Sequence, residues 1–180
     1  MKKALIFLTT GFEEIEALAT IDILRRGGVN VQTVSLTDNK QVEGGHSIAV
    51  IADLLFSEVQ FVNIDVLILP GGTVKINEHE GLKKQVKAFY DAGKYVSAIC
   101  AAPMVLGGLG ILEDKEATCY PGFEQYLKGA VLKTEQAVVV SGNIITGKGP
   151  ALTFDFALRL VEILEGKEKR DEVAKGLLLA

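Results

Sequence analysis

Short apolar runs alternate along this chain with longer segments in which apolar residues recur at helical spacing. A run with almost no polar interruption is typical of a strand covered on both faces, as in a parallel sheet. Such strands are predicted at residues 3–9, 30–36, 65–69 and 95–99, with helices at 12–26 and from 77 or 79 to 90. Strands that alternate with helices of this length form right-handed parallel crossovers, so the pattern predicts an α/β protein.

Two tight turns indicate β-hairpins beside this alternation, at Gly44-Gly45 and at Gly142-Asn143. Each turn joins two short apolar runs, which are 41–43 with 47–51 and 137–141 with 144–146. The other expected elements are a strand at 117–119 and helices at 103–106, 121–127, 150–165 and 167–178.

The helical segments also indicate which residues face the core. In the first helix, residues recur at helical spacing at Ile15, Leu18, Ala19 and Asp22-Ile23. In the second helix the expected inward residues are Leu82, Val86 and Phe89. In the last long helix, one apolar stripe is formed by Phe154, Ala157, Leu158, Val161 and Leu164. We therefore predict a single domain over residues 1–180, a doubly wound sandwich whose mostly parallel sheet carries helices on both faces.

Composition narrows the class of protein. Of the 180 residues, 48% are apolar and 23% are charged, the mix of an ordinary globular protein. The net charge of −4 and the lack of a dense run of Lys and Arg argue against a nucleic-acid partner. Two cysteines are too few for a disulfide scaffold or a zinc ribbon, and the apolar runs are shorter than the roughly 20 residues of a membrane span. The apolar run at 4–8 is too short for a signal peptide, so a cytoplasmic location is expected.

Cys100 stands at the end of the strand predicted at 95–99. Small residues follow it, and Pro103 suits the first turn of a helix, where its missing N–H costs nothing. A strand that turns sharply into a helix presents the residue at the turn to the following N–H groups and to the positive helix end. These features favour a Cys100 thiolate at neutral pH. The alternative is an ordinary buried thiol, since free cysteine is among the most buried residue types.

In a doubly wound sheet the site lies beyond the carboxyl ends of the strands. Cys100 is the candidate nucleophile there, and the N–H groups of Gly71, Gly72 and Ala101 are candidate oxyanion donors. Glu16 follows the first strand and is the candidate acid–base partner, with a pKa that burial and a nearby anion would raise.

Each of these residues also has a structural interpretation. The glycine pair can be a plain tight turn, and Glu16 can be a solvated helix residue, an interpretation that fits Glu13 and Glu14 better.

Histidine is scarce, and neither His46 nor His79 is close to Cys100 in the sequence. His79 is expected at the surface near a helix start, and His46 could reach the site only across the fold or from another subunit. Cys119 is expected to be structural or a redox partner of Cys100. The glycine-rich segments lack the dinucleotide fingerprint and the P-loop lysine, and no ligand spacing indicates a metal, so no cofactor and no metal are expected.

Four motifs, in this order, carry a resemblance to a known family. They are Gly11-Phe12-Glu13-Glu14-Ile15-Glu16, Leu69-Pro70-Gly71-Gly72, Ala98-Ile99-Cys100-Ala101-Ala102-Pro103 and Thr146-Gly147-Lys148-Gly149-Pro150. Together they resemble the ThiJ/PfpI superfamily, and within it the branch of the Parkinson-disease protein. The resemblance implies a flavodoxin-like sandwich, a homodimer and a reactive elbow cysteine. It further implies that this cysteine is readily oxidised to a sulfinate that accepts a hydrogen bond from a protonated glutamate, roles that fall on Cys100 and Glu16.

The resemblance implies two kinds of activity. One is a glutathione-independent glyoxalase or deglycase that acts on a small aldehyde such as methylglyoxal or on a glycated substrate. The other is a redox-sensing or chaperone-like stress protein, in which Cys100 is oxidised and turnover is weak or absent. A protease is not expected, because its Cys-His elbow is missing: Ala101 follows Cys100.

The chain departs from the family pattern next to the site. Where the pattern has Thr-His-Pro, this chain has Cys119-Tyr120-Pro121. Tyr120 and Pro121 are expected to line the substrate pocket, but a phenol with a reference pKa of about 10 is a poor base at neutral pH. The resemblance also implies that His46, together with Arg26, approaches Cys100 of a neighbouring subunit.

Overall fold

The computed structural model describes residues 1–179, and a seven-stranded sheet forms its centre. The strands are β1 (Lys3–Leu8), β2 (Asn30–Ser35), β5 (Leu54–Leu55), β6 (Val66–Leu69), β7 (Tyr95–Ile99), β10 (Val138–Ser141) and β11 (Ile144–Gly147). They lie in the order β10-β11-β7-β6-β1-β2-β5, and every neighbouring pair is parallel except β10 and β11. The five strands β2-β1-β6-β7-β11 follow the flavodoxin-like order. The predicted fold class is confirmed.

Two small sheets lie outside the central one. Strands β3 (Gln41–Glu43) and β4 (Ala49–Ile51) form the predicted antiparallel hairpin. Strands β8 (Glu116–Ala117) and β9 (Val131–Leu132) pair in parallel. Strands β5 and β9 were not predicted, because two residues are too few to show a period of two.

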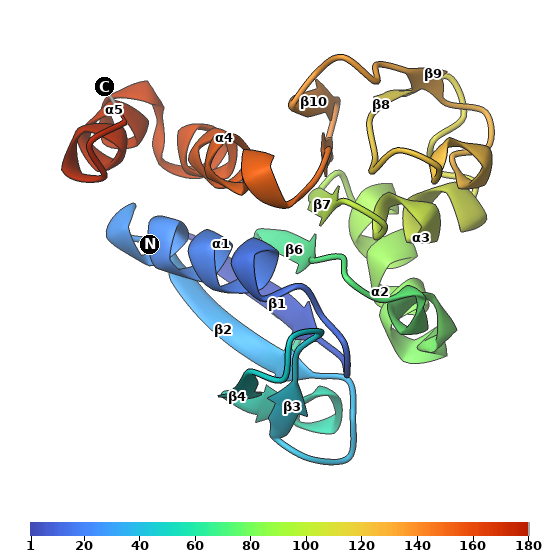
Figure 1. Cartoon of the computed structure of the whole chain (residues 1–180), viewed down its shortest axis with the longest axis horizontal. Coiled ribbons are helices and arrows are strands. Elements are labelled where there is room, and N and C mark those ends of the chain that lie inside the picture. Colours follow the sequence, from blue (N-terminus) through green and yellow to red (C-terminus); the bar gives the residue numbers. More distant parts are fainter. Residues whose placement is uncertain (180) are drawn as a thin grey trace.

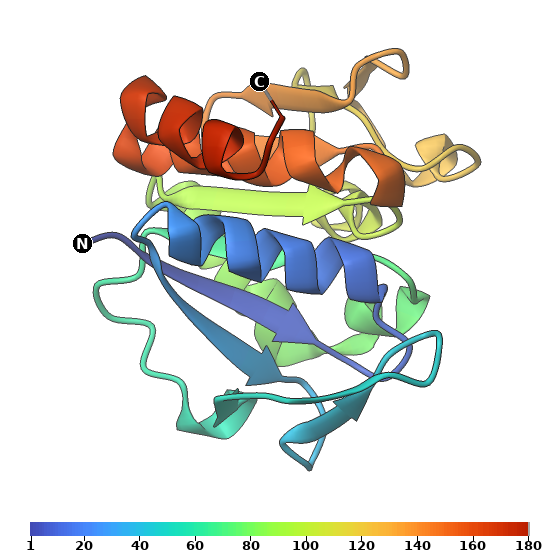
Figure 2. The same cartoon turned by 60° about the vertical axis from the view of Figure 1, so that its left-hand side comes forward.

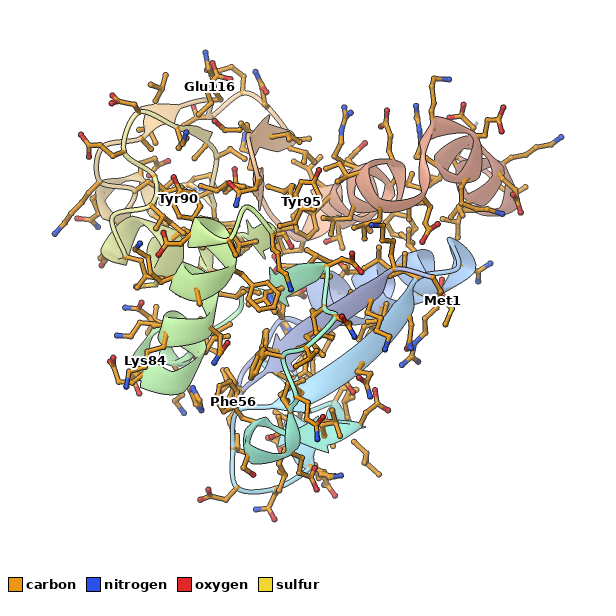
Figure 3. All side chains as sticks on the ribbon, turned by 180° about the vertical axis from the view of Figure 1, so that it is seen from behind. Met1, Phe56, Lys84, Tyr90, Tyr95 and Glu116 are labelled. Carbon is orange, nitrogen blue, oxygen red and sulfur yellow. The ribbon has the colours of Figure 1, made fainter. Side chains whose placement is uncertain are left out.

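Helices cover both faces of the sheet (Figures 1 and 2). They are α1 (Glu14–Arg26), α2 (Glu80–Asp91), α3 (Pro103–Gly108), α4 (Thr153–Glu165) and α5 (Lys167–Gly176). Four 3-10 turns complete the structure, at Phe56–Glu58, Val74–Glu78, Glu124–Tyr126 and Pro150–Leu152. In Figure 3, Lys84 on α2 and Glu116 on β8 point away from the packed interior. Among residues 1–179, no helix is both long enough and apolar enough to cross a membrane.

Alternate residues of β1 enter two separate cores. Ala4, Ile6 and Leu8 pack with residues of α1 and α4 on one face. Leu5 and Phe7 pack with residues of α2 and α3 on the other. A strand buried on both faces has no polar side, which explains the uninterrupted apolar run in the sequence.

Of the residues at helical spacing in α1, Ile23 is buried, but Ile15 and Leu18 are exposed. Ile15 is 54% exposed and Leu18 is 38% exposed. The buried residues of α1 are Glu14, Glu16, Ala17, Thr20, Ile21, Ile23 and Leu24. Apolar residues lie on nearly all sides of this helix, so its hydrophobic periodicity alone does not identify the buried face. The buried face is the one that carries the small residues Ala17 and Thr20, because the sheet and α4 pack against that side.

The expected inner face of α4 needs one correction. Phe154 is 38% exposed, whereas Phe156 is fully buried. Gly147 leaves the space for the Phe156 ring, because a Cβ at that glycine would lie 2.8 Å from the ring. In α2 the expected inward residues Leu82, Val86 and Phe89 are buried. His79 is half-buried, and its Nδ1 caps α2 by accepting the N–H of Leu82 at 2.9 Å.

Candidate active site

The switch point of the sheet places the ends of β1, β6 and β7 side by side. The chain leaves β1 toward β2 on one side and leaves β6 toward β7 on the other, so a crevice opens where the direction reverses. Glu16 follows β1, Gly71 follows β6 and Cys100 follows β7. The topology therefore brings together three residues that lie far apart in the sequence.

Cys100 adopts a backbone conformation that is uncommon for a residue with a side chain. Its φ is 65°, in the left-handed region. Two hydrogen bonds of 2.9 Å hold it there, from its N–H to the oxygen of Gly147 and from the N–H of Tyr120 to its own oxygen. The side chain is 8% exposed. A strained residue that its neighbours fix in place is a candidate for function.

Glu16 is fully buried next to the Cys100 thiol. Its Oε2 accepts the N–H of Gly71 at 2.8 Å. Its Oε1 is buried and makes no hydrogen bond to a nitrogen or oxygen of the described chain. Burial raises the pKa of Glu16 to about 7, against the lowering effect of the Cys100 and Gly71 contacts, and the Glu13 charge raises it as well. This carboxyl can therefore give and take a proton near neutral pH.

The surroundings of Cys100 oppose the thiolate that the sequence suggested at neutral pH. Burial, followed by the charge of Glu16, raises the pKa of its thiol to about 12. The N–H groups of Ala101 and Gly72 bond to the sulfur and lower the pKa, but they do not outweigh these two effects. Helix α3 has only six residues, so its dipole contributes little. Formation of a thiolate here therefore needs a base, and the Glu16 carboxyl lies beside the thiol.

Gly71 and Gly72 are needed for space, so the plain-turn interpretation is insufficient. A Cβ on Gly71 would lie 2.7 Å from the Cβ of Cys100 and 2.8 Å from Oε2 of Glu16. Gly72 has a φ of 92°, and a Cβ there would collide with the N–H of Glu13. The role expected for Gly71 needs correction, because its N–H is already given to Glu16 and is not free for an oxyanion. Of the three expected donors, Gly72 and Ala101 direct N–H groups at the sulfur.

Glu13 and Glu14 are not the solvated helix residues that the sequence suggested. They are 9% and 5% exposed. Glu14 is bound by His46, with 2.6 Å from the His46 N–H to Oε1 and 2.7 Å between Nδ1 and Oε2. Burial would raise the pKa of Glu14, but these bonds lower it overall, and they raise the pKa of His46.

One group among residues 1–179 has the ligand atoms for a metal ion. Atoms of Glu13, Glu14 and His46 lie within 4.8 Å of one another. Carboxylate and imidazole ligands suit zinc. Sequence spacing could not reveal this group, because His46 lies 32 residues from Glu14.

Of the remaining candidate residues, Tyr120 contacts Cys100, whereas Arg26 lies at the far end of α1. Tyr120 is bonded to Cys100 through the backbone, lies over Gly149 and is 45% exposed; Pro121 beside it is also exposed. Arg26 pairs with Asp22 at 2.6 Å in the last turn of α1, about 15 Å along the helix axis from Glu16. Within this chain Arg26 is therefore outside the site.

Cys119 is a free thiol in the other core. It is 1% exposed and packs with the residues on the α2 and α3 side of the sheet. Burial raises its pKa to about 11. These surroundings fit the structural role rather than that of a redox partner.

Comparisons with known proteins identify chains of similar sequence and fold. The DJ-1/PfpI family model matches residues 2–163. Protein dj-1beta of Drosophila melanogaster is 36% identical over 99% of this chain and 98% of its own length. Its crystal structure has a TM-score of 0.95, with 99% of this chain and 98% of that chain covered.

Two further relatives extend the comparison. A Caenorhabditis elegans protein named glutathione-independent glyoxalase DJR-1.2 is 34% identical over 99% of this chain and 97% of its own length. DJ-1 homolog B of Arabidopsis thaliana is 39% identical over 99% of this chain, but this chain spans only 42% of that protein.

Proposed function

This chain belongs to the DJ-1/PfpI family, and we propose that it acts on reactive aldehydes through Cys100, converting methylglyoxal to lactate without glutathione. A glycated thiol or amine formed from methylglyoxal presents the same carbon atom, so a deglycase-type reaction is part of the proposal. The name of the C. elegans relative supports the reaction class. The single observation that carries the proposal is the buried, unpartnered Oε1 of Glu16 beside the Cys100 thiol.

The first step is the attack of sulfur on the aldehyde carbon of methylglyoxal. The thiol, with a pKa of about 12, needs a base, and ionised Glu16 takes its proton. The new C–S bond leaves a negative charge on the aldehyde oxygen, which the Gly72 and Ala101 N–H groups are placed to stabilise. Glu16 then returns the proton to that oxygen, and a hemithioacetal results.

The second step moves one proton between two neighbouring carbons. Glu16 removes the proton from the former aldehyde carbon while the ketone oxygen gains a proton, which gives an enediol. Glu16 then delivers its proton to the former ketone carbon as the hydroxyl on the former aldehyde carbon loses its own, so a lactoyl thioester forms on Cys100. Water then cleaves the C–S bond, releases lactate and restores the thiol. A carboxyl with a pKa of about 7 can act as base and acid in turn at neutral pH.

The test follows methylglyoxal consumption and D- or L-lactate formation in wild type, Cys100→Ser and Glu16→Gln. We expect both variants to lose turnover by about a hundredfold or more, the usual range for a lost acid–base group. Wild-type turnover should fall below about pH 7, because protonated Glu16 cannot take the thiol proton. Cys119→Ala is the matched control, since it removes the other thiol from a different core. Lactate formation that persists in Cys100→Ser would rule out the proposal.

A second function uses the same geometry. Two N–H donors at the sulfur and a carboxyl that can hold a proton would stabilise Cys100 as a sulfinate, the state expected of a redox sensor. Wild type that makes no lactate, but gains two oxygen atoms at Cys100 under mild peroxide, would favour this function. Oxidation of Cys119 before Cys100 would contradict it.

The proposal includes a homodimer. Ile15 and Leu18 are exposed on α1, and Ile48 and Ile51 are exposed on the β3–β4 hairpin. The hairpin is joined to the start of α1 through the Glu14–His46 pair. Apolar residues gathered on neighbouring exposed elements are typical of a protein–protein interface.

A further inference from the structure

Three hydrogen bonds beyond the end of β7 close a ring that holds the main chain of Cys100. The N–H of Cys100 donates to the oxygen of Gly147 on β11, and the N–H of Tyr120 donates to the oxygen of Cys100, both at 2.9 Å. In the third bond, the N–H of Thr118 donates to Oγ1 of Thr146 at 3.0 Å. Thr146 is joined covalently to Gly147. Thr118 lies two residues before Tyr120, so the ring returns to Cys100.

The ring lies at the point where the pairing of β7 with β11 ends. The last pair of that ladder is Ile99 with Gly147, and Cys100 is the next residue. Its φ of 65° is a conformation that a residue with a side chain disfavours. The ring binds both the N–H and the oxygen of Cys100, and so fixes the peptide planes on either side of it. The direction of the Cys100 side chain follows from these two planes.

Thr146 contributes a side-chain hydroxyl to the ring, whereas the other groups of the ring belong to the main chain. Thr146 and Thr118 are both fully buried, as are Ile144 and Ile145 before them on β11. Packing alone does not call for a threonine in such a strand, because valine has the same shape and no hydroxyl to remove from water. The bond to the Thr118 N–H, which would otherwise be a buried donor without a partner, accounts for the hydroxyl.

We propose that Thr146 is a positioning residue whose hydroxyl, by closing this ring, holds Cys100 in the conformation that its proposed reaction needs. The hydroxyl anchors the segment that leaves β8, and Tyr120 in that segment holds the oxygen of Cys100. The sulfur is thereby kept in line with the N–H groups of Gly72 and Ala101. Thr146 acts through the main chain and takes no part in the chemistry. The inference rests on the proposed role of Cys100 as the nucleophile.

The experiment breaks the ring with Thr146→Val, which removes the hydroxyl but keeps the shape of the side chain. We expect kcat for lactate formation to fall by up to about a hundredfold, the cost of a misplaced reacting group. KM should change less, because a fully buried residue does not bind substrate directly. Thr146→Ser, which still offers an oxygen to the Thr118 N–H, should recover most of kcat.

Thr33→Val is the matched control for the loss of a buried hydroxyl. Oγ1 of Thr33 also accepts a main-chain N–H, that of Asp53 at 2.8 Å, but on β2, away from the site. We expect this variant to keep the wild-type kcat. An equal fall of kcat in Thr33→Val, or no recovery in Thr146→Ser, would overturn the inference. Circular dichroism checks that the variants fold, and Thr146→Ala removes the same hydroxyl with less bulk if the added methyl group of valine disturbs folding.

A second measurement needs no turnover. Alkylation of Cys100 by iodoacetamide, followed by mass spectrometry, reports how well the thiol is presented, and hydrogen exchange at the Tyr120 N–H reports whether the ring is closed. In Thr146→Val we expect slower alkylation, because the N–H donors at the sulfur lose their alignment, and faster exchange. Thr146→Ser and Thr33→Val should match wild type in both.

The two measurements separate this inference from the proposed reaction. An unchanged alkylation rate in Thr146→Val would contradict the positioning role, even with faster exchange at Tyr120. Wild type that makes no lactate, but whose variants show the expected alkylation and exchange, would remove the glyoxalase proposal and leave the role of Thr146 intact.

Discussion

At the scale of single residues, the site depends on a glycine as much as on its chemical groups. Gly71 donates to Glu16, accepts from Glu13 and leaves no room for a side chain beside Cys100. Its φ is outside the left-handed region, so the requirement for glycine here is space and not backbone conformation. Gly71, which has no reactive side chain, thus determines how closely the Glu16 carboxyl and the Cys100 thiol approach each other.

Gly71→Ala should therefore damage the site more than the fold. A Cβ 2.7 Å from that of Cys100 forces β6 or the Cys100 turn to move, at a cost of about 1–3 kcal/mol, which is usual for overpacking. We expect a lower Tm and loss of lactate formation. Gly176→Ala is the control, because a Cβ there meets no atom within 4 Å. A Gly71→Ala protein with wild-type turnover would show that the close approach has no role in the reaction.

At the scale of elements, α1 has two separate tasks. Its first turn directs carboxyl groups into the switch point, and its outer side exposes Ile15 and Leu18. The apolar pattern of the helix reflects both its neighbours in the chain and the proposed partner subunit. In the subunit itself, the exposure of Ile15 and Leu18 shows that the apolar pattern extends beyond the buried face of α1.

Leu18→Lys should convert the proposed dimer into a monomer. A lysine at this exposed position places a charge within the interface but leaves the core of the subunit intact. Light scattering after size-exclusion chromatography measures the mass, and circular dichroism checks that the fold remains. Val62→Lys is the control, since Val62 is exposed but lies on neither α1 nor the hairpin. A wild-type protein that elutes as a monomer would contradict the proposed interface.

At the scale of the whole molecule, a buried carboxyl links stability to pH. The folded state raises the pKa of Glu16 from 4.5 to about 7, so it holds this proton more tightly than the unfolded chain does. Its contribution to stability is therefore fully present below about pH 4.5 and is lost as pH rises to about 7. Glu14 has the opposite sign, because its pKa is lowered in the folded state.

Glu16→Gln isolates the contribution of this one group. Above about pH 7 we expect the variant to be more stable than wild type by about 3 kcal/mol, because it has no charge to bury. At about pH 4 the two proteins should be nearly equal in stability. Urea unfolding at both pH values measures the difference. A difference that does not change with pH would mean that Glu16 ionises like an exposed glutamate.

The sequence by itself determined the features that depend on neighbours along the chain. The alternation of strands and helices, both hairpins and the position of Cys100 at the end of β7 follow from local periods and turn residues, and the four ordered motifs indicated the family. These features arise from residues within a few positions of one another, so they can be recognised in the sequence alone.

Only the tertiary structure determined which groups are in contact and which are buried from solvent. The bond from Gly71 to Glu16 spans 55 residues, and the pair between Glu14 and His46 spans 32. The burial of Glu13 and Glu14, the inner face of α1 and the raised pKa of Cys100 all depend on segments brought in from elsewhere in the chain. Desolvation is set by every atom around a group, so the protonation of the Glu16–Cys100 pair is a property of the folded molecule.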